Sequence, residues 1–435
     1  MKMGGELARS AGVFSAASFV PLTVARASQL SLLAACMGFL FASRAIYVLV
    51  SARWLNAGTE AGVVAGFVLE FALALAIALN AFGCRKSLSI RIFDSRPLQW
   101  VMLYLAFSGC SLLWSTAASV GTSALYWGEL PCDVCIVVLL VRNCGAEFAA
   151  HSLMKGFISG TCILAAIAWI MPAAADLRLG DIDYFNTNQI GNLCALSLLM
   201  CNLLAKRGDG IWAGITWLLV TTLFRSLSKS TLIAFAACLV YGLIRDSGAK
   251  RATKWLLVGS GITLTLIFWG LLSAYYGAYT TTGNQAETLT GRTAIWAWAL
   301  DASLARPWFG NGFDAMWKVA PPFGGDLFEA RHAENELLQQ FFSYGACGIV
   351  LLAGVYGSLY RRIRKIPQDP ERVALTAFLV YVLVRGAAEA EPFDLLLPSW
   401  LIAALAFLLE RDAQCAGSND RLRHPQAECR QDKSF

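Results

Sequence analysis

Charge is scarce in this sequence. Only 15% of its 435 residues are Asp, Glu, Lys or Arg, whereas soluble domains contain about a quarter. Together with a mean hydropathy of +0.56, this scarcity excludes an ordinary water-soluble enzyme. The apolar residues form blocks of about twenty, long enough to cross a hydrocarbon layer about 30 Å thick as helices. Because the short alternating segments of a membrane β-barrel are lacking, we predict an all-α polytopic membrane protein.

Histidine is also rare, and the cysteines are badly placed for a disulfide framework. The histidines are His151, His332 and His424, and most of the thirteen cysteines fall inside apolar blocks. Buried free thiols are therefore the better interpretation. Cys132 and Cys135 have the spacing of a redox or metal pair, but no second pair accompanies them. With no second histidine or cysteine near His332 and no acidic cluster, we expect neither a metal nor a cofactor.

Basic residues lie in short clusters between the apolar blocks, and the net charge is +6. Such clusters are typical of cytoplasmic loops rather than of a nucleic-acid-binding surface. With both termini in the cytoplasm and about twelve spans, each cluster falls inside, as the positive-inside rule requires. The expected spans are residues 31–51, 61–82, 98–117, 120–141, 152–172, 189–206, 211–226, 229–246, 254–274, 337–360, 372–388 and 393–410. The basic clusters lie at residues 85–96, 206–207, 245–254 and 361–365.

The fourth span is the weakest, because Glu129, Pro131 and Asp133 interrupt it. Without this span, every downstream basic cluster would face outward, so we retain it. The N-terminus has no continuous apolar region followed by a small-residue cleavage site, so we expect no cleaved signal peptide.

This topology divides the chain into four parts. Membrane helices occupy residues 1–274 and 337–410, and a cytoplasmic tail at residues 411–435 is expected to be disordered. Residues 275–336 form a large external loop containing short interfacial helices. Within it we predict a helix at residues 291–304 that lies along the membrane surface, and a second short piece at 313–317.

His332 stands where this loop meets the tenth span. A lone histidine is more often structural than catalytic, but Arg331, Glu334 and Asn335 surround this one, and Arg292 belongs to the same loop. Imidazole can take up a proton near neutral pH. We therefore treat His332 as a candidate general base.

Charged residues at membrane depth cost a few kcal/mol each and need a partner or a cavity. Arg44 and Glu70 are best explained as a structural ion pair between the first two spans. Arg225 and Lys229 flank several hydroxyls at the outer face, where cations are disfavoured. They suit a phosphate or diphosphate group, and the alternative is snorkelling to lipid headgroups.

Two further charges, Arg385 and Glu389, are spaced one helical turn apart at the outer end of the eleventh span. Either they pair with each other, or they line the same outer cavity as Arg225 and Lys229. Both interpretations stay open.

Several segments in this region resemble the signature of the O-antigen ligase and O-antigen polymerase superfamily, with the exopolysaccharide polymerases nearest in character. They are Gly291 and Arg292 followed by Trp296, residues 306–313 (RPWFGNGF), residues 332–339 (HAENELLQ), and Gly345 with Gly348. Residues 228–230 (SKS) and 186–192 (NTNQIGN) are similar to the upstream elements of that family. The resemblance covers residues 180–400.

The resemblance implies a membrane glycosyltransferase at the outer face of the bacterial inner membrane, with the large loop periplasmic. Its donor would be a glycan on undecaprenyl diphosphate. Basic residues would hold the diphosphate, here Arg292 and Lys229, and the loop histidine, here His332, would assist transfer. Family members often carry a second histidine where this chain has Glu334, so either His332 or Glu334 could be the base.

The leading hypothesis is polymerisation of lipid-linked repeat units into exopolysaccharide or O-antigen. Ligation of the finished glycan to lipid A-core or to a protein is the alternative, and a lipid-linked oligosaccharide flippase or transporter is the alternative of another class. The absence of an internal repeat disfavours a transporter. Expected partners are the lipid-linked donor, a glycan or lipid A-core acceptor, membrane lipids and other polysaccharide assembly proteins. The candidate catalytic residues are His332, Glu334 and Arg292; the candidate substrate-binding residues are Lys229, Arg225, Arg385, Asn335 and Glu389.

Overall fold

A computed structural model describes residues 24–82, 95–171, 178–180, 186–210, 213–246, 250–281, 292–323, 329–366 and 369–423. Over these residues the chain is helical and has no strand. The helices are α1 (Val24–Leu49), α2 (Thr59–Phe82), α3 (Arg96–Cys110), α4 (Val120–Cys144), α5 (Ala146–Ile170), α6 (Thr187–Lys206), α7 (Ala213–Ser226), α8 (Lys229–Arg245), α9 (Arg251–Ile267), α10 (Trp269–Thr281), α11 (Arg292–Ala305), α12 (Glu336–Ile363), α13 (Asp369–Arg385) and α14 (Ser399–Arg423). Gly291 and most of the basic cluster at 85–96 lie outside the described residues.

Each expected span coincides with a helix or with a pair of consecutive helices. In the described part of the chain, six helices are long and apolar enough to cross a membrane: α1, α2, α4, α5, α6 and α12. Crossing by the others stays a prediction. The ninth span is divided between α9 and α10, and the third is shorter than expected. The predicted disorder of the tail is wrong up to Arg423, since α14 continues to that residue.

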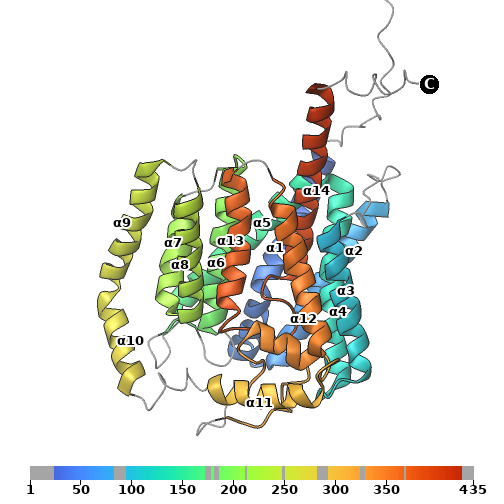
Figure 1. Ribbon diagram of the computed structural model, residues 1–435, viewed down its shortest axis with the longest axis vertical. Coiled ribbons are helices and arrows are strands. Elements are labelled where there is room, and N and C mark those ends of the chain that lie inside the picture. Colours follow the sequence, from blue (N-terminus) through green and yellow to red (C-terminus); the bar gives the residue numbers. More distant parts are fainter. Residues whose placement is uncertain are drawn as a thin grey trace, which may run out of the picture.

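Antiparallel helices form the bundle, and α11 lies across one end of it (Figure 1). The C-terminal end of α14 projects from the opposite end (Figure 1). Two ion pairs of that opposite end join Lys206 to Asp246, at 2.7 Å, and Arg207 to Glu371. The cations of these basic clusters thus lie at one end of the bundle and the large loop lies at the other, as the expected topology requires. The orientation of the bundle in a membrane stays a prediction.

The weakest expected span, α4, is one continuous helix despite Pro131. Its acidic residues face Arg44 of α1: the Nη2 atom of Arg44 lies 2.8 Å from Asp133 Oδ1, and the Nε atom lies 2.8 Å from Glu129 Oε1. The Nη2 atom is also 2.8 Å from Glu70 Oε2. The ion pair predicted between Arg44 and Glu70 is present, and α4 enlarges it to a cluster. Charges inside a membrane helix are tolerated because they meet one another there.

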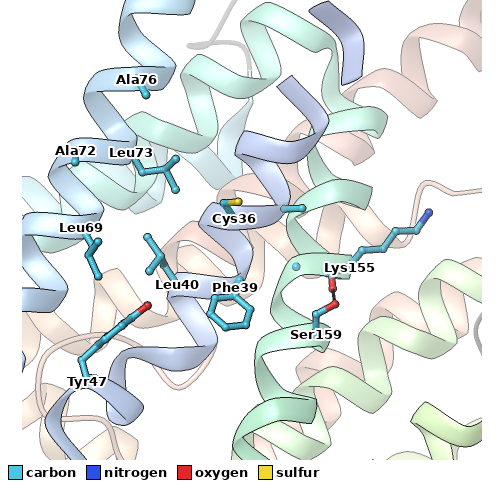
Figure 2. A pocket seen from close by; sticks show the side chains of 12 residues that line it. Cys36, Phe39, Leu40, Tyr47, Leu69, Ala72, Leu73, Ala76, Lys155 and Ser159 are labelled. Carbon is cyan, nitrogen blue, oxygen red and sulfur yellow. Dashed lines mark hydrogen bonds between the residues drawn. The ribbon is translucent and has the colours of Figure 1, made fainter. Parts of the chain in front are cut away.

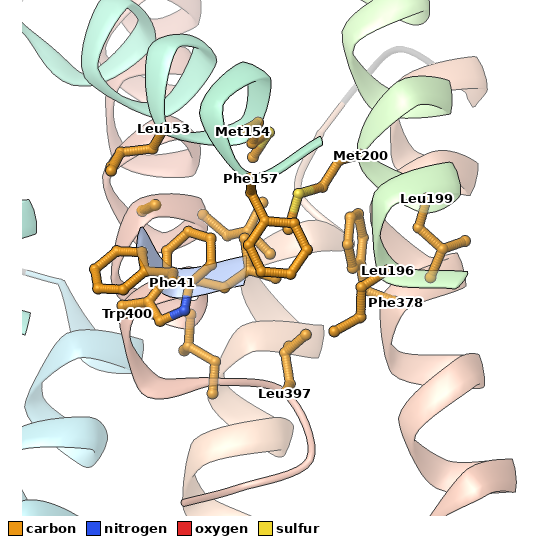
Figure 3. Packing of buried hydrophobic residues seen from close by; sticks show 14 of the residues in the cluster. Phe41, Leu153, Met154, Phe157, Leu196, Leu199, Met200, Phe378, Leu397 and Trp400 are labelled. Carbon is orange, nitrogen blue, oxygen red and sulfur yellow. The ribbon is translucent and has the colours of Figure 1, made fainter. Parts of the chain in front are cut away.

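Aromatic side chains join the helices at the centre of the bundle (Figure 3). Phe41 of α1 stacks on Trp400 of α14 with ring centroids 4.6 Å apart, and Phe157 of α5 lies 5.6 Å from the same indole. Phe378 of α13 lies in the same cluster. Stacked rings of this kind hold helices that are distant in the sequence together.

Glycines allow α1 and α5 to approach closely. A Cβ atom at Gly156 would lie 1.9 Å from the carbonyl oxygen of Ala35, and one at Gly38 would lie 1.9 Å from the carbonyl oxygen of Leu153. Both obstacles are backbone atoms, which cannot rotate away. Small residues at such crossings are the usual means by which membrane helices pack without a hydrophobic driving force.

Replacing Gly156 should therefore destabilise the bundle. We expect Gly156→Ala to lower the free energy of unfolding by about 1–3 kcal/mol, because the two helices must separate. Thermal unfolding in detergent measures the change. Gly128→Ala is the matched control, since nothing lies within 4 Å of a Cβ at that position. Equal stability of the two variants would contradict the prediction.

Candidate active site

The helix α11 is held against the end of the bundle by apolar contacts. Ile295 and Ala299 are buried in a cluster with Met316, Ala333 and Phe342. This helix confirms the element expected at residues 291–304 to within a residue at each end. Residues 313–317, the second interfacial piece expected, form turns rather than a helix, and Phe313 is buried. Their place at the membrane surface stays a prediction.

Residues 306–313 dock into a break in α12. The break is at Gly345, whose φ of +63° is not helical. The amides of Asn311 and Gly312 donate to the carbonyl oxygens of Phe342, at 2.9 Å, and Ser343, at 2.8 Å. A broken helix leaves backbone groups without partners, and this loop supplies them. These hydrogen bonds therefore fix residues 306–313 on α12.

Close approach explains why glycines stand on both sides of this contact. A Cβ at Gly310 would lie 2.5 Å from Ser343 backbone atoms, and one at Gly345 would lie 2.4 Å from the carbonyl carbon of Trp308. Both residues also have positive φ, which only glycine adopts without strain. The contact fixes the distance between α11 and the start of α12.

Glu389 is the residue on which the site converges. One carboxylate oxygen, Oε1, accepts hydrogen bonds from Arg292 Nη2 at 2.8 Å, Asn188 Nδ2 at 2.9 Å and Ser230 Oγ at 3.0 Å. The donors come from α11, α6 and α8 respectively. The side chain of Glu389 is only 4% exposed. Its carboxylate therefore ties together three helices at the loop end of the bundle.

Glu334 is the second carboxylate bound to Arg292. The Nε atom of Arg292 donates to Glu334 Oε2 at 3.1 Å, and its Nη2 atom lies 3.0 Å from the same oxygen. Burial raises the pKa of Glu334 above its usual range, and the nearby Glu389 acts in the same direction, whereas His332 and Arg292 oppose the shift. Glu334 also has a φ of +51°. Left-handed backbone at a residue other than glycine is strained, and such strain concentrates at functional sites.

His332 lies beside Glu334. Its Nδ1 atom accepts a hydrogen bond from the backbone N–H of Glu334 at 3.2 Å and lies 3.8 Å from Glu334 Oε1. A neutral imidazole that accepts at Nδ1 carries its proton on Nε2. In this arrangement Nε2 is the nitrogen from which His332 can donate a hydrogen bond.

Asn335 and Glu336 begin α12 and are used internally. The Asn335 side chain accepts from the amide of Leu338 at 2.9 Å, as an N-cap does, and donates to the carbonyl oxygen of Ala387 at 3.0 Å. Glu336 is buried and accepts from Tyr356 Oη of the same helix at 2.6 Å and from the amide of Leu396, in the α13–α14 connection, at 3.0 Å. These bonds fasten the start of α12 to the α13–α14 connection, which carries Glu389.

The other candidate cations lie at the ends of three different helices. Lys229 is the first residue of α8, close enough to Arg292 for the two cations to interact electrostatically. Arg225 lies in the last turn of α7. The helical pairing of Arg385 with Glu389 is wrong, because α13 ends at Arg385. Glu389 pairs with Arg292 instead, and Arg385 Nη1 lies 3.5 Å from Glu391 Oε1.

A separate groove of about 680 Å³ lies where α1 passes between α2 and α5 (Figure 2), and none of the candidate site residues lines it. Its walls are mostly apolar, with Tyr47 on α1, Leu69 on α2, and Ser159 and Lys155 on α5 (Figure 2). No carboxylate or histidine lines it. The carboxylates and the histidine of the candidate site thus lie outside this groove.

Two residues of the site, Asn188 and Ser230, were not among the expected site residues. Both contact Glu389 directly. A signal was present, since each lies in a segment that carries the family resemblance. Amide and hydroxyl groups are too common in sequences to be singled out without knowledge of the fold.

Comparison with known proteins gives concordant matches. Residues 214–353 match the family model described as O-antigen ligase (Wzy_C). The chain is 22% identical over 333 residues to the exopolysaccharide production protein ExoQ of Rhizobium meliloti (strain 1021). The aligned region covers 69% of this chain and 73% of that protein. The chain is 26% identical over 317 residues to an O-antigen ligase of Pseudomonas aeruginosa (strain PAO1), which covers 68% of this chain and 74% of that protein.

Proposed function

We propose that this chain is a multi-pass inner-membrane glycosyltransferase of the O-antigen ligase and polymerase superfamily that polymerises glycans carried on undecaprenyl diphosphate. The matching family model, the two relatives and the six helices long and apolar enough to cross a membrane support this proposal. The product is an exopolysaccharide or O-antigen, and the reaction takes place on the periplasmic side. The observation that carries the proposal is the convergence of Arg292, Glu334 and His332 with the first residues of α6 and α8. Cations, a strained carboxylate and an imidazole then share one edge of the bundle.

The reaction needs two kinds of group, and this edge contains both. The acceptor hydroxyl oxygen bonds to the anomeric carbon while the bond from that carbon to the diphosphate oxygen breaks, through an oxocarbenium-like transition state. The electron pair leaves with the diphosphate. Fixed cations stabilise this growing negative charge more in the transition state than in the ground state. Arg292 and Lys229 are the residues assigned to that task, with no metal required.

The hydroxyl proton goes to Glu334. Its Oε2 atom is bound to Arg292, whereas Oε1 is directed to the side of His332. A carboxylate with a raised pKa is a better base near neutral pH than an ordinary one. His332, with Nδ1 accepting from the Glu334 backbone, supports the strained turn and can donate from Nε2 to an oxygen of the acceptor or donor.

A reconstituted assay tests the function. Proteoliposomes containing the protein and an undecaprenyl-diphosphate-linked oligosaccharide should yield longer lipid-linked glycans, resolved by gel or mass spectrometry. Movement of the donor across the bilayer without any new glycosidic bond would instead identify a flippase. Transfer to an added lipid A-core, with no elongation, would identify a ligase, as the Pseudomonas aeruginosa relative is named.

The pH dependence of transfer should report on Glu334. The carboxylate must be ionised to accept a proton, so kcat should rise with pH through a pKa above the ordinary glutamate value of 4.5. In its protonated form His332 lowers the pKa of Glu334, so His332→Ala should move this acid limb to higher pH. His151→Ala, at the other end of the bundle, is the control. A limb that stays in place or moves to lower pH in His332→Ala would argue against Glu334 as the base.

A further inference from the structure

The hydrogen bonds around Glu389 are those of an anion-binding site. Three donors from three helices meet at one oxygen, at 2.8 Å to 3.0 Å. Asn188 and Ser230 are the second residues of α6 and α8, and Arg292 is the first residue of α11. The first turn of a helix presents unpaired N–H groups and the positive end of the helix dipole, which favour negative charge. Side chains from the starts of three helices, one of them a guanidinium, therefore donate to one position.

The charge that occupies this position belongs to the chain itself. Glu389 lies in the connection between α13 and α14, outside any helix. One of these donors, Arg292, is also assigned to the diphosphate in the proposed function. A carboxylate and a diphosphate cannot share these donors, because adjacent like charges repel strongly in a partly buried site.

We propose that Glu389 is an internal anion that fills the diphosphate site and is displaced when the lipid-linked donor binds. The inference rests on the proposed function and gives Glu389 a role opposite to substrate binding. Glu389 competes with the donor, so a ligand must carry more negative charge than a single carboxylate to enter. The site thereby discriminates a diphosphate from the singly charged phosphodiesters of ordinary phospholipids.

Arg385 offers the displaced carboxylate a second position. Its guanidinium is only 2% exposed and interacts electrostatically with Glu389. Its Nη1 atom lies 3.5 Å from Glu391 Oε1, and within the described residues its buried Nε atom makes no hydrogen bond. Buried donors without acceptors cost free energy, and rotation of Glu389 away from Arg292 would supply one. The carboxylate then exchanges one arginine for the other and stays paired.

Removing the charge of Glu389 tests this inference through binding alone. We expect Glu389→Gln to bind inorganic diphosphate about tenfold or more tightly than the unaltered protein, measured by isothermal titration calorimetry in detergent, because the competing anion is gone. Glu389→Ala should change affinity in the same direction. Asp246→Asn is the matched control, since Asp246 is also a buried carboxylate paired with a cation, at the far end of the bundle. Its affinity should equal that of the unaltered protein.

A loss of diphosphate affinity in the Glu389 variants, or no change, overturns the inference. If Glu389 merely orients Arg292, both variants will bind diphosphate more weakly or unchanged. If the variants fail to fold, a measurement on the unaltered protein replaces them. Saturating diphosphate should increase amide hydrogen exchange in residues 387–391. Unchanged or slower exchange would contradict displacement. Absence of diphosphate binding in all proteins overturns it as well.

Failure of the proposed function gives a different pattern. If the unaltered protein transfers no glycan while Glu389→Gln gains affinity for diphosphate, the displacement stands without the glycosyltransferase. If transfer occurs and affinity does not rise, the function stands and the displacement falls.

Discussion

Replacing Arg292 by alanine should reduce glycan elongation by about 10²–10³-fold in kcat. The guanidinium is proposed to stabilise the charge that grows on the leaving diphosphate, and removal of one such donor typically has an effect of this size. The loss should appear in the reconstituted assay as accumulation of unextended donor. Arg292→Lys should recover only part of the rate, because ammonium keeps the charge but loses the planar geometry that binds two oxygens.

A structural contribution must be separated from the catalytic one. Arg292 bridges Glu334 and Glu389, so its removal leaves two carboxylates without their cation, which destabilises the loop end of the bundle. Thermal unfolding in detergent measures that part. Arg306→Ala is the control for the loop, because Arg306 lies in the same loop with an exposed side chain. Elongation at the normal rate in folded Arg292→Ala would reject the assignment.

Glu334→Gln should lower kcat by about 10²–10⁴-fold, the usual contribution of a general base. Glutamine is nearly isosteric and can still accept a hydrogen bond from Arg292, but it cannot take up the hydroxyl proton. The residual rate should lose the acid limb of its pH profile, which the parent owes to ionisation of Glu334. Initial rates of elongation at saturating donor, measured across the pH range, give both quantities.

Comparison with His332→Ala identifies the base. If His332 supports the turn and donates from Nε2, its removal should cost less than the loss of Glu334 and should leave an acid limb in the profile. A larger loss in His332→Ala than in Glu334→Gln, with the limb abolished, would make His332 the base instead. Glu329→Gln, in the same loop with an exposed side chain, controls for a change of loop charge.

Much of the architecture follows from the sequence, because hydrophobicity and helix length are local properties. A block of apolar residues of the right length predicts a helix whatever it packs against. The expected spans and the helix at α11 accordingly have counterparts in the structure. The ionic contact between Arg44 and Glu70 was also foreseeable, since charges at membrane depth need partners. The participation of Glu129 and Asp133 was not, because it depends on how α4 is rotated.

The sequence alone determined that this is a helical membrane protein with a polar loop, and motif residues marked Arg292, His332 and Glu334 as candidates. The tertiary structure alone decided which charges meet. It ended α13 at Arg385, so Arg385 and Glu389 do not share a helix, and it brought Glu389 to Arg292 together with Asn188 and Ser230. The physical reason is that helix formation uses contacts a few residues apart, whereas these partners are 97, 201 and 159 residues apart in the chain. Only packing of the bundle sets such distances.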